Sequence, residues 1–206
     1  MTTNLENKVT TAHSKFFAYL SRLRWIKRWG LMRNAYQENV MEHSWEVATI
    51  AHALALIHNE YFDGSVDANA IATAALYHDA SEILTGDLPT PIKYHSADIT
   101  AAYQKIEHQA EDELVSLLPL ELGAVYTKSL KTDQQPEMHK RLIKAADTLS
   151  AYLKCLAELR TGNREFEQAA ENTKRLLTDY QLPAVKYFME TFVSSNDLSL
   201  DALMHS

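Results

Sequence analysis

The chain has 206 residues, of which 46% are hydrophobic and 23% are charged, close to the usage of an average globular protein. This composition excludes a fibrous or disordered chain, and the length suits one domain, which we expect to span residues 1–206. A formal net charge of −7 argues against binding to a nucleic-acid polymer, because such binding depends on many contacts to phosphates.

Two further features predict a soluble, cytoplasmic protein without a membrane partner. No uncharged apolar run reaches the roughly 20 residues that a membrane span needs, and the N-terminus lacks the apolar core of a secretory signal. The single cysteine, Cys155, excludes an internal disulfide and fits a reducing compartment. We interpret Cys155 as a small buried apolar residue, and we expect residues 1–12 to be a loosely ordered extension.

Helical patterns dominate the chain, so the predicted fold class is all-α. A first helix is expected over about residues 13–24, followed by an irregular segment that contains Gly30. A second helix is expected from near Met41, because apolar residues then follow one helical face until the turn at Asp63 and Gly64.

The remaining elements are also predicted to be helical. A third helix, capped by Asp67, is expected to run through His78 towards Leu84 and to end at Gly86. Pro89 and Pro91 then predict a loop. Further helices are expected over about residues 97–118, 136–160 and 166–180.

A local excess of positive charge interrupts this acidic chain. Between residues 15 and 37 there is no Asp or Glu, whereas six basic residues occur: Lys15, Arg22, Arg24, Lys27, Arg28 and Arg33. This segment therefore predicts a binding site for a small anion.

Several ionisable side chains occur where apolar residues are expected. His43 occupies a position on the apolar stripe of its helix, although a core histidine with a hydrogen-bond partner would fit there too. His78 and Asp79 are adjacent, so both can reach one centre only if it lies near the end of their helix. Glu82 follows one turn later, and a solvated polar helix end is the alternative interpretation of all three.

Asp147 lies in a helix whose apolar residues cover more than half of its surface. An ionised carboxylate in such a place costs several kcal/mol unless a cation or strong donors compensate it. A salt bridge to Lys144 is the structural explanation, and a metal ion is the functional one.

Together these residues form a set that suits a metal. Two imidazoles and two carboxylates with open positions are typical of divalent first-row metals, so we predict one divalent cation held by His43, His78, Asp79 and Asp147. Co, Mn, Zn, Fe and Cu are all compatible with these ligands, and the sequence does not select among them.

The order His43, His78-Asp79, Asp147 resembles the H…HD…D signature of the HD-domain phosphohydrolase superfamily. Closer agreement comes from six stretches, namely residues 16–23, 28–34, 38–44, 77–82, 85–93 and 151–158. Together they are similar to the bacterial 5'-deoxynucleotidase (YfbR-like) family, and the likeness extends over nearly the whole chain. The chain departs from that family at Gly30, where proline is expected, at Met41 and in its N-terminal extension.

This resemblance implies a single HD-domain helical bundle that acts as a homodimer. It implies metal-dependent hydrolysis of deoxyribonucleoside 5'-monophosphates to deoxynucleoside and phosphate, broad in base and selective against ribonucleotides. Arg28 is expected to orient the phosphate, which its planar fork can clamp bidentately, although composition alone would make it a surface charge. Trp29 is expected to lie against the sugar, where its bulk could exclude a 2'-hydroxyl; by default it would be an ordinary core or surface aromatic.

The resemblance also assigns the segment after the His-Asp pair to the substrate. Asp87 would accept a hydrogen bond from the 3'-hydroxyl, with Leu88, Pro89 and Thr90 beside it, although Asp87 could equally be a turn residue. The ligands His43, Asp79 and Asp147 are expected to border the substrate as well. Glu82, which is not an expected ligand, is the candidate general acid or base.

Two alternatives remain open at this point. One is an HD-domain hydrolase of another nucleotide phosphoester, and the other is a non-catalytic module that binds a metal or nucleotide for regulation. The remaining histidines fit no comparable arrangement, so we interpret them as surface or structural residues: His13, His52, His58, His95, His108, His139 and His205.

Overall fold

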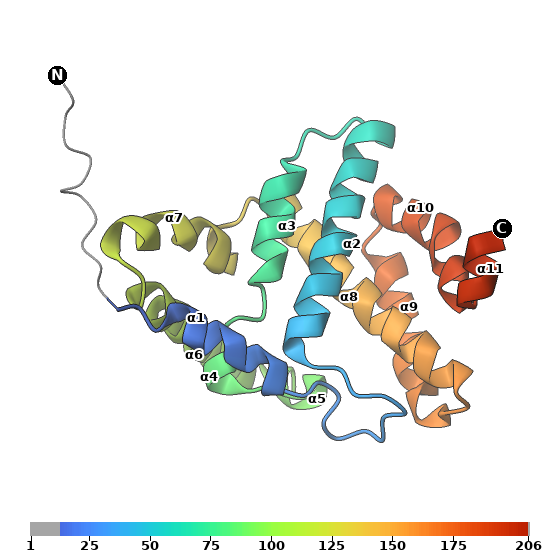
Figure 1. The fold of residues 1–206 in the computed structure, drawn as a ribbon, viewed down its shortest axis with the longest axis horizontal. Coiled ribbons are helices and arrows are strands. Elements are labelled where there is room, and N and C mark those ends of the chain that lie inside the picture. The colour runs from blue at the N-terminus through green and yellow to red at the C-terminus, as the bar shows by residue number, and fades with distance from the viewer. Residues whose placement is uncertain (1–12, 206) are drawn as a thin grey trace.

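The computed structural model describes residues 13–205, and its secondary structure in this range is helical (Figure 1). The all-α prediction is therefore confirmed, and extended pairing among the described residues is limited to one bridge between Lys27 and Asn39. The α-helices are α1 (Phe16–Leu20), α2 (Val40–Tyr61), α3 (Ala68–Leu76), α4 (Glu82–Thr85), α5 (Thr90–Lys93), α6 (Ala97–Ser116), α7 (Leu120–Leu130), α8 (Glu137–Arg160), α9 (Glu167–Asp179), α10 (Pro183–Thr191) and α11 (Leu200–His205). The 3₁₀ helices are η2 (Ser21–Trp25), η3 (Thr132–Gln134), η4 (Arg164–Phe166) and η5 (Val193–Asp197).

Local side-chain caps explain where two of these helices begin. The Asn39 side chain accepts from the backbone N–H of Glu42, whose carboxylate accepts in turn from the Asn39 N–H, so α2 starts with a capping box. The predicted cap of α3 is confirmed, since Asp67 accepts from the N–H of Ala70 at 3.0 Å.

The third helix is shorter than predicted, because α3 ends at Leu76 and not near Leu84. From Tyr77 onwards the backbone makes turns in which an N–H donates to the carbonyl three residues earlier. Tyr77 N–H, for example, donates to the Ala74 carbonyl at 3.1 Å. The imidazole of His78 also hydrogen-bonds to the Ala75 carbonyl. In a continuing helix this carbonyl would accept from the backbone N–H of Asp79. The predicted stop is confirmed at the end of α4, where Gly86 adopts φ 70°.

Other differences from the predictions concern short helices. The first predicted helix, residues 13–24, is divided into α1 and η2. The predicted proline loop contains α5, since Pro91 lies in a first helical turn where a missing N–H costs nothing. Helices α7 and α10 were not expected; they follow Pro119 and begin at Pro183, respectively.

The core consists of two hydrophobic clusters. The larger one lies where α2 packs against α3, α8 and α10, with α9 on the other side of α8 (Figure 1). The smaller one joins Phe16, Ala80, Leu114 and Leu130, so it connects α1 with α6, α7 and the turn after α3. Cys155 is buried in the larger cluster, as predicted.

Two further sequence predictions concern the N-terminal extension and membrane-spanning helices. The expected N-terminal extension, residues 1–12, lies outside the described residues. Within residues 13–205, no helix combines the length and apolar character required to cross a membrane.

Candidate metal centre and active site

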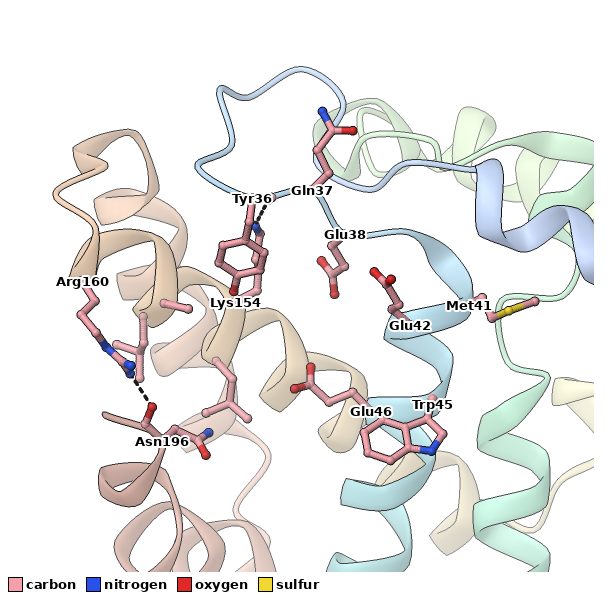
Figure 2. A pocket seen from close by; sticks show the side chains of 13 residues that line it. Tyr36, Gln37, Glu38, Met41, Glu42, Trp45, Glu46, Lys154, Arg160 and Asn196 are labelled. Carbon is pink, nitrogen blue, oxygen red and sulfur yellow. Dashed lines mark hydrogen bonds between the residues drawn. The ribbon is translucent and has the colours of Figure 1, made fainter. Parts of the chain in front are cut away.

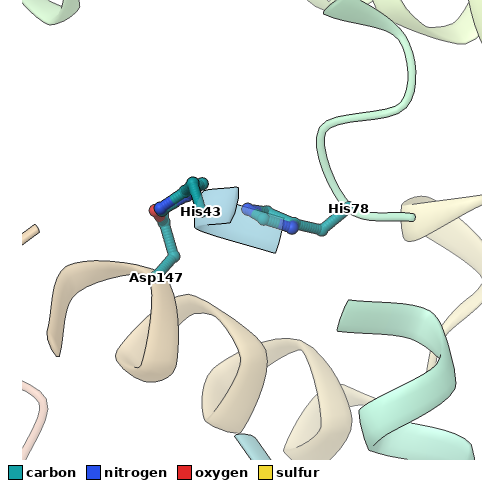
Figure 3. A group of neighbouring side chains, drawn as sticks. All are labelled: His43, His78 and Asp147. Atoms are coloured by element: carbon teal, nitrogen blue, oxygen red, sulfur yellow. The ribbon is translucent and has the colours of Figure 1, made fainter. Parts of the chain in front are cut away.

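Three of the four predicted ligands converge on one point. His43 comes from the first turn of α2, His78 from the turn after α3, and Asp147 from α8 (Figure 3). One ligand atom from each lies within 4.8 Å of the other two. These residues are widely separated in the sequence, so the packing of α2 between α3 and α8 is what brings them together.

The two imidazoles present the same nitrogen to this point. His78 Nδ1 lies 2.8 Å from the carbonyl oxygen of Ala75, so Nδ1 carries the proton and donates. His43 Nδ1 lies 3.1 Å from Ser150 Oγ, whose own proton goes to Glu46 Oε2 at 2.5 Å. Both Nε2 atoms are buried and lack a hydrogen-bond partner among the described residues. With Nδ1 protonated, each Nε2 keeps the free lone pair that a metal ion requires.

Asp147 divides its two oxygens between a salt bridge and the candidate centre. Oδ2 accepts from Lys144 Nζ at 2.8 Å, so the salt bridge considered from the sequence is present. Oδ1 lies 3.2 Å from His43 Nε2. Burial opposes ionisation of Asp147, but Lys144 and the His43 imidazole hold its pKa well below the ordinary range.

Asp79 lies beside these three residues. Its Oδ2 is 3.2 Å from His78 Nε2 and 3.5 Å from His43 Nε2. The same oxygen accepts from Arg28 Nη1 at 3.2 Å. Burial disfavours the charge, yet His78, His43 and Arg28 together hold the pKa of Asp79 below its usual value. The carboxylate is therefore ionised and available to a cation.

This donor set fits a divalent cation of the zinc, manganese or cobalt type. Two imidazole Nε2 atoms and two ionised carboxylates meet in one place, and these nitrogens have no hydrogen-bond partner among the described residues. Without a metal, burial lowers the pKa of His43, but Asp147 and Glu38 raise it to about 9, so the surroundings favour positive charge there. The chemistry of the donors thus agrees with the predicted metal.

Of the six basic residues in the segment predicted to bind an anion, Arg28 is the one that contacts the predicted ligand residues, through Asp79. Lys15, Arg22, Arg24, Lys27 and Arg33 are exposed. The segment 28–38 is nevertheless well anchored despite Gly30, because Glu158 accepts from the Ala35 N–H at 2.8 Å and Lys154 donates to the Tyr36 carbonyl at 2.7 Å.

Glu82 and Asp87 lie close to the same centre. Glu82 is buried, and its Oε2 has no hydrogen-bond partner among residues 13–205. Burial, together with the charges of Asp79 and Asp87, raises the pKa of Glu82 to about 10. Burial also raises the pKa of Asp87. The positive charge of Arg28 lowers this pKa, and the negative charge of Asp79 raises it further. Glu82 therefore keeps its proton at neutral pH in the absence of a bound cation.

The rest of the predicted substrate loop is less closely connected. Leu88 and Pro89 are half-buried and Thr90 is exposed. Among the described residues, no hydrogen bond or ion pair links these three side chains to the ligand residues. Trp29 does contact the site's surroundings, through a hydrogen bond from its indole Nε1 to Glu38 Oε2 at 2.9 Å.

Sequence reasoning missed the residues that support the ligands. Ser150 and Glu46 orient His43, and Glu38 Oε1 lies 3.6 Å from the same Nδ1 atom. Glu38 and Glu46 also line a pocket beside the first turns of α2, together with Tyr36, Lys154 and other residues (Figure 2). None of the four predicted metal ligands lines this pocket.

A second group of possible ligands was also missed. His108, Glu111 and Asp133 offer atoms within 4.8 Å of one another. His108 and Asp133 are exposed, however, and Lys131 at the end of α7 forms an ion pair with Asp112 of α6. The pKa of Lys131 is raised first by Asp112 and further by Asp133 and Glu111, so a cation of the chain already lies near these carboxylates.

Comparisons with known proteins identify the family. The model of the 5'-deoxynucleotidase YfbR-like family matches residues 15–196. A 5'-deoxynucleotidase of Erwinia tasmaniensis is 51% identical over 191 residues, which cover 93% of this chain and 96% of the relative. A 5'-deoxynucleotidase of Yersinia pestis is 52% identical over 190 residues, covering 92% of this chain and 96% of that protein.

Solved structures agree at the level of the fold. An HD-domain phosphohydrolase from Listeria innocua matches with a TM-score of 0.78 and 22% identity, covering 92% of both chains. The HD phosphohydrolase DatZ of cyanophage S-2L, bound to dA and one catalytic Zn²⁺ ion, matches with a TM-score of 0.63 and 22% identity, covering 86% of this chain and 96% of that one. With the helical architecture, the converging H…HD…D residues and the family match in agreement, the chain belongs to the YfbR-like 5'-deoxynucleotidase family.

Proposed function

We propose that this chain is a metal-dependent 5'-deoxynucleotidase. It hydrolyses deoxyribonucleoside 5'-monophosphates to deoxynucleoside and phosphate, accepts several bases and discriminates against ribonucleotides. One observation carries the proposal: two buried imidazole nitrogens that have no hydrogen-bond partner within residues 13–205 face two ionised carboxylates, with the guanidinium of Arg28 beside them. The names of the relatives, which are about half identical to this chain, support the same reaction.

One divalent cation is the proposed cofactor, held by His43, His78, Asp79 and Asp147. When bound, such a cation polarises the phosphoryl group and lowers the pKa of an attacking water, towards ~7 in the best zinc cases. The hard carboxylates and borderline imidazoles accept Co, Mn, Zn, Fe or Cu.

Arg28 is proposed to orient the phosphate. Asp79 accepts from Nη1 at 3.2 Å and holds the guanidinium in place, and no other hydrogen bond from the guanidinium is made to the described residues, so its remaining N–H groups can donate to a phosphate. Its side chain is only 13% exposed, and a charge-assisted hydrogen bond to phosphate is stronger in such surroundings than in water.

Glu82 is proposed to act as the general acid. Because burial favours its neutral form, it can carry a proton at neutral pH and give it to the departing 5'-oxygen. A cation beside Asp79 reduces the contribution of that carboxylate to the raised pKa, but the burial of Glu82 persists.

Selection of the deoxy sugar is assigned to Trp29 and to the segment from Asp87 to Thr90. The indole is proposed to occupy the space that a 2'-hydroxyl needs, and Asp87 to accept from the 3'-hydroxyl, with Leu88 and Pro89 alongside. His43, Asp79 and Asp147 are proposed to border the substrate as well. The half-burial of Asp87 near Arg28 supports this arrangement.

We further propose that the protein acts as a single-domain cytoplasmic homodimer. The family resemblance is the basis for the dimer, and the buried, unpaired Cys155 fits a reducing compartment. Light scattering on a sizing column tests the dimer, since a monomeric mass at micromolar concentration would contradict it.

The decisive experiment measures phosphate release from dAMP and AMP after chelation and again after Co, Mn, Zn or Mg is restored. We expect release from dAMP that requires the metal, with little release from AMP. Equal release from both nucleotides would remove the sugar selection and keep the hydrolase. No release with any metal, despite a bound ion, would favour the regulatory module instead.

A further inference from the structure

The backbone at Trp29 has an unusual conformation. Its φ is 57°, in the left-handed region that bulky residues rarely occupy. Such a conformation persists only where the surrounding structure enforces it, and it is common at functional positions. The contacts that enforce it here are therefore informative about what the Trp29 side chain does.

Two kinds of contact hold Trp29. Its carbonyl accepts from the N–H of Met32 at 2.9 Å and from the Asn34 side chain at 3.2 Å, which closes a turn. Its indole ring lies 5.3 Å from the ring of Phe166, and its Nε1 donates to Glu38 Oε2 at 2.9 Å. The ring is thus fixed by one aromatic contact and one hydrogen bond to a carboxylate.

Glu38 reaches the neighbouring functional residue as well. Its Oε2 lies 3.8 Å from Arg28 Nε, and its carbonyl oxygen accepts from the Arg28 N–H at 3.0 Å. The Glu38 residue is only 9% exposed, so these interactions are shielded from water. One carboxylate therefore lies between the proposed phosphate clamp and the proposed sugar-reading ring.

We propose that Glu38 is a positioning residue that sets the preference for deoxynucleotides, by fixing the Trp29 indole and the Arg28 guanidinium with one carboxylate. The inference rests on the proposed function. Glu38 acts through these two side chains and not on the substrate itself. Its other oxygen, Oε1, lies 3.6 Å from His43 Nδ1, so bound metal has to be measured beside activity in every Glu38 variant. The indole contact governs sugar selection, whereas the charge facing Arg28 governs how well both kinds of nucleotide react.

Two substitutions separate these contributions. Glu38→Gln keeps an oxygen that can accept from the indole N–H but removes the charge that faces Arg28. Glu38→Ala removes both. Glu42→Gln is the matched control, because Glu42 is exposed on the same turn of chain and glutamine preserves its capping box.

The measured quantity is the ratio of kcat/KM for dAMP to kcat/KM for AMP. We expect Glu38→Ala to lower this ratio about tenfold to a hundredfold, the range for losing a hydrogen bond to a charged group. Glu38→Gln is expected to lower kcat/KM for both nucleotides while the ratio stays within about threefold of the wild type. Glu42→Gln is expected to change neither quantity.

Trp29→Phe shows whether the effect passes through the indole. Because phenylalanine lacks the N–H, Trp29→Phe is expected to lower the ratio, and Glu38→Ala is expected to add little to it in the double variant. If the two effects multiply, or if Glu38→Ala leaves the ratio unchanged, the proposal is overturned. Bound metal and melting temperature, measured for every variant, separate these effects from loss of the metal or the fold.

A spectroscopic readout distinguishes failure of the inference from failure of the proposed function. The chain has three tryptophans, so its NMR spectrum has three indole N–H signals, and Trp29→Phe assigns the relevant one. That signal is expected to move in Glu38→Ala and to stay close to its position in Glu38→Gln. An unmoved signal in Glu38→Ala overturns the proposal whether or not the enzyme acts on dAMP. If Glu38→Ala does not fold, Trp29→Phe and Glu38→Gln decide, since an unchanged ratio in the first or a collapsed ratio in the second contradicts the proposal.

Discussion

Helix α8 carries two buried charged clusters that differ in how far their polar atoms are satisfied. Around Glu158, both oxygens accept hydrogen bonds, from Lys154, Asn163 and the backbone of Ala35. About three turns earlier, around Asp147, the Nε2 atoms of His43 and His78 are buried without a hydrogen-bond partner among the described residues.

We interpret this difference as one between a structural cluster and a candidate functional cluster. A saturated buried ion pair fixes chain segments in place, here the segment 28–38 against α8. An unsaturated set of donors and acceptors costs free energy unless a ligand completes it. Stability should therefore depend mainly on the Glu158 cluster, and activity on the Asp147 cluster.

The largest effect is expected from Asp147→Asn. Loss of a ligand charge should lower kcat/KM by more than about a hundredfold, because even residues that only support metal ligands are worth about 10–100-fold. Metal content by atomic spectroscopy, measured with activity, tests this expectation. A variant that keeps a full complement of metal and near-normal activity would remove Asp147 from the site.

The next largest effect is expected from Glu82→Gln. Glutamine is similar in shape but cannot donate a carboxyl proton, so kcat should fall about 10²–10⁴-fold. Metal binding should change little, because Glu82 is not a proposed ligand. Single-turnover phosphate release separates the chemical step from product release, and an unaltered chemical step would show that Glu82 transfers no proton.

Glu158→Gln is the corresponding test of the structural cluster. Breaking a buried ion pair leaves Lys154 uncompensated, so the free energy of unfolding should fall by about 3–5 kcal/mol. Urea titrations of the two proteins give this difference. Glu167→Gln breaks the exposed pair with Arg164 and serves as the control, where a loss as large as that of Glu158→Gln would refute the distinction.

A smaller effect concerns pH. The pKa of Glu82 is raised to about 10 in the folded, metal-free protein, so the folded state holds a proton that the unfolded state has lost. The stability of the chelated protein should therefore fall as pH rises from about 5 towards 10. Denaturant titrations at several pH values should give a shallower slope for Glu82→Gln, and parallel slopes would argue against a buried neutral carboxyl.

The smallest effect concerns Cys155. Burial raises the pKa of this thiol to about 12, so it should not react with a thiol reagent at pH 8 while the protein is folded. Reaction on addition of denaturant provides the positive control. Rapid labelling of the native protein would show that the α8 face of the core opens readily.

The sequence was sufficient for the helical class and for residues whose chemistry conflicts with an apolar setting, such as His43 and Asp147. It was not sufficient for the path of the chain at Tyr77, because the Ala-rich segment before it favours continuing the helix. The roles of Glu38 and Ser150 could not be predicted either. Their contacts are defined by the tertiary fold, since Ser150 hydrogen-bonds to His43 although the two residues are 107 positions apart in the sequence.

The early end of α3 places His78 and Asp79 between the two hydrophobic clusters. Ala75 belongs to the larger cluster, and Ala80 to the smaller one. His43 and Asp147 lie on helices of the larger cluster, whereas the other two predicted ligands, His78 and Asp79, lie between the two clusters. The proposed catalytic centre thus lies between the two hydrophobic clusters, and its geometry depends on the packing of both.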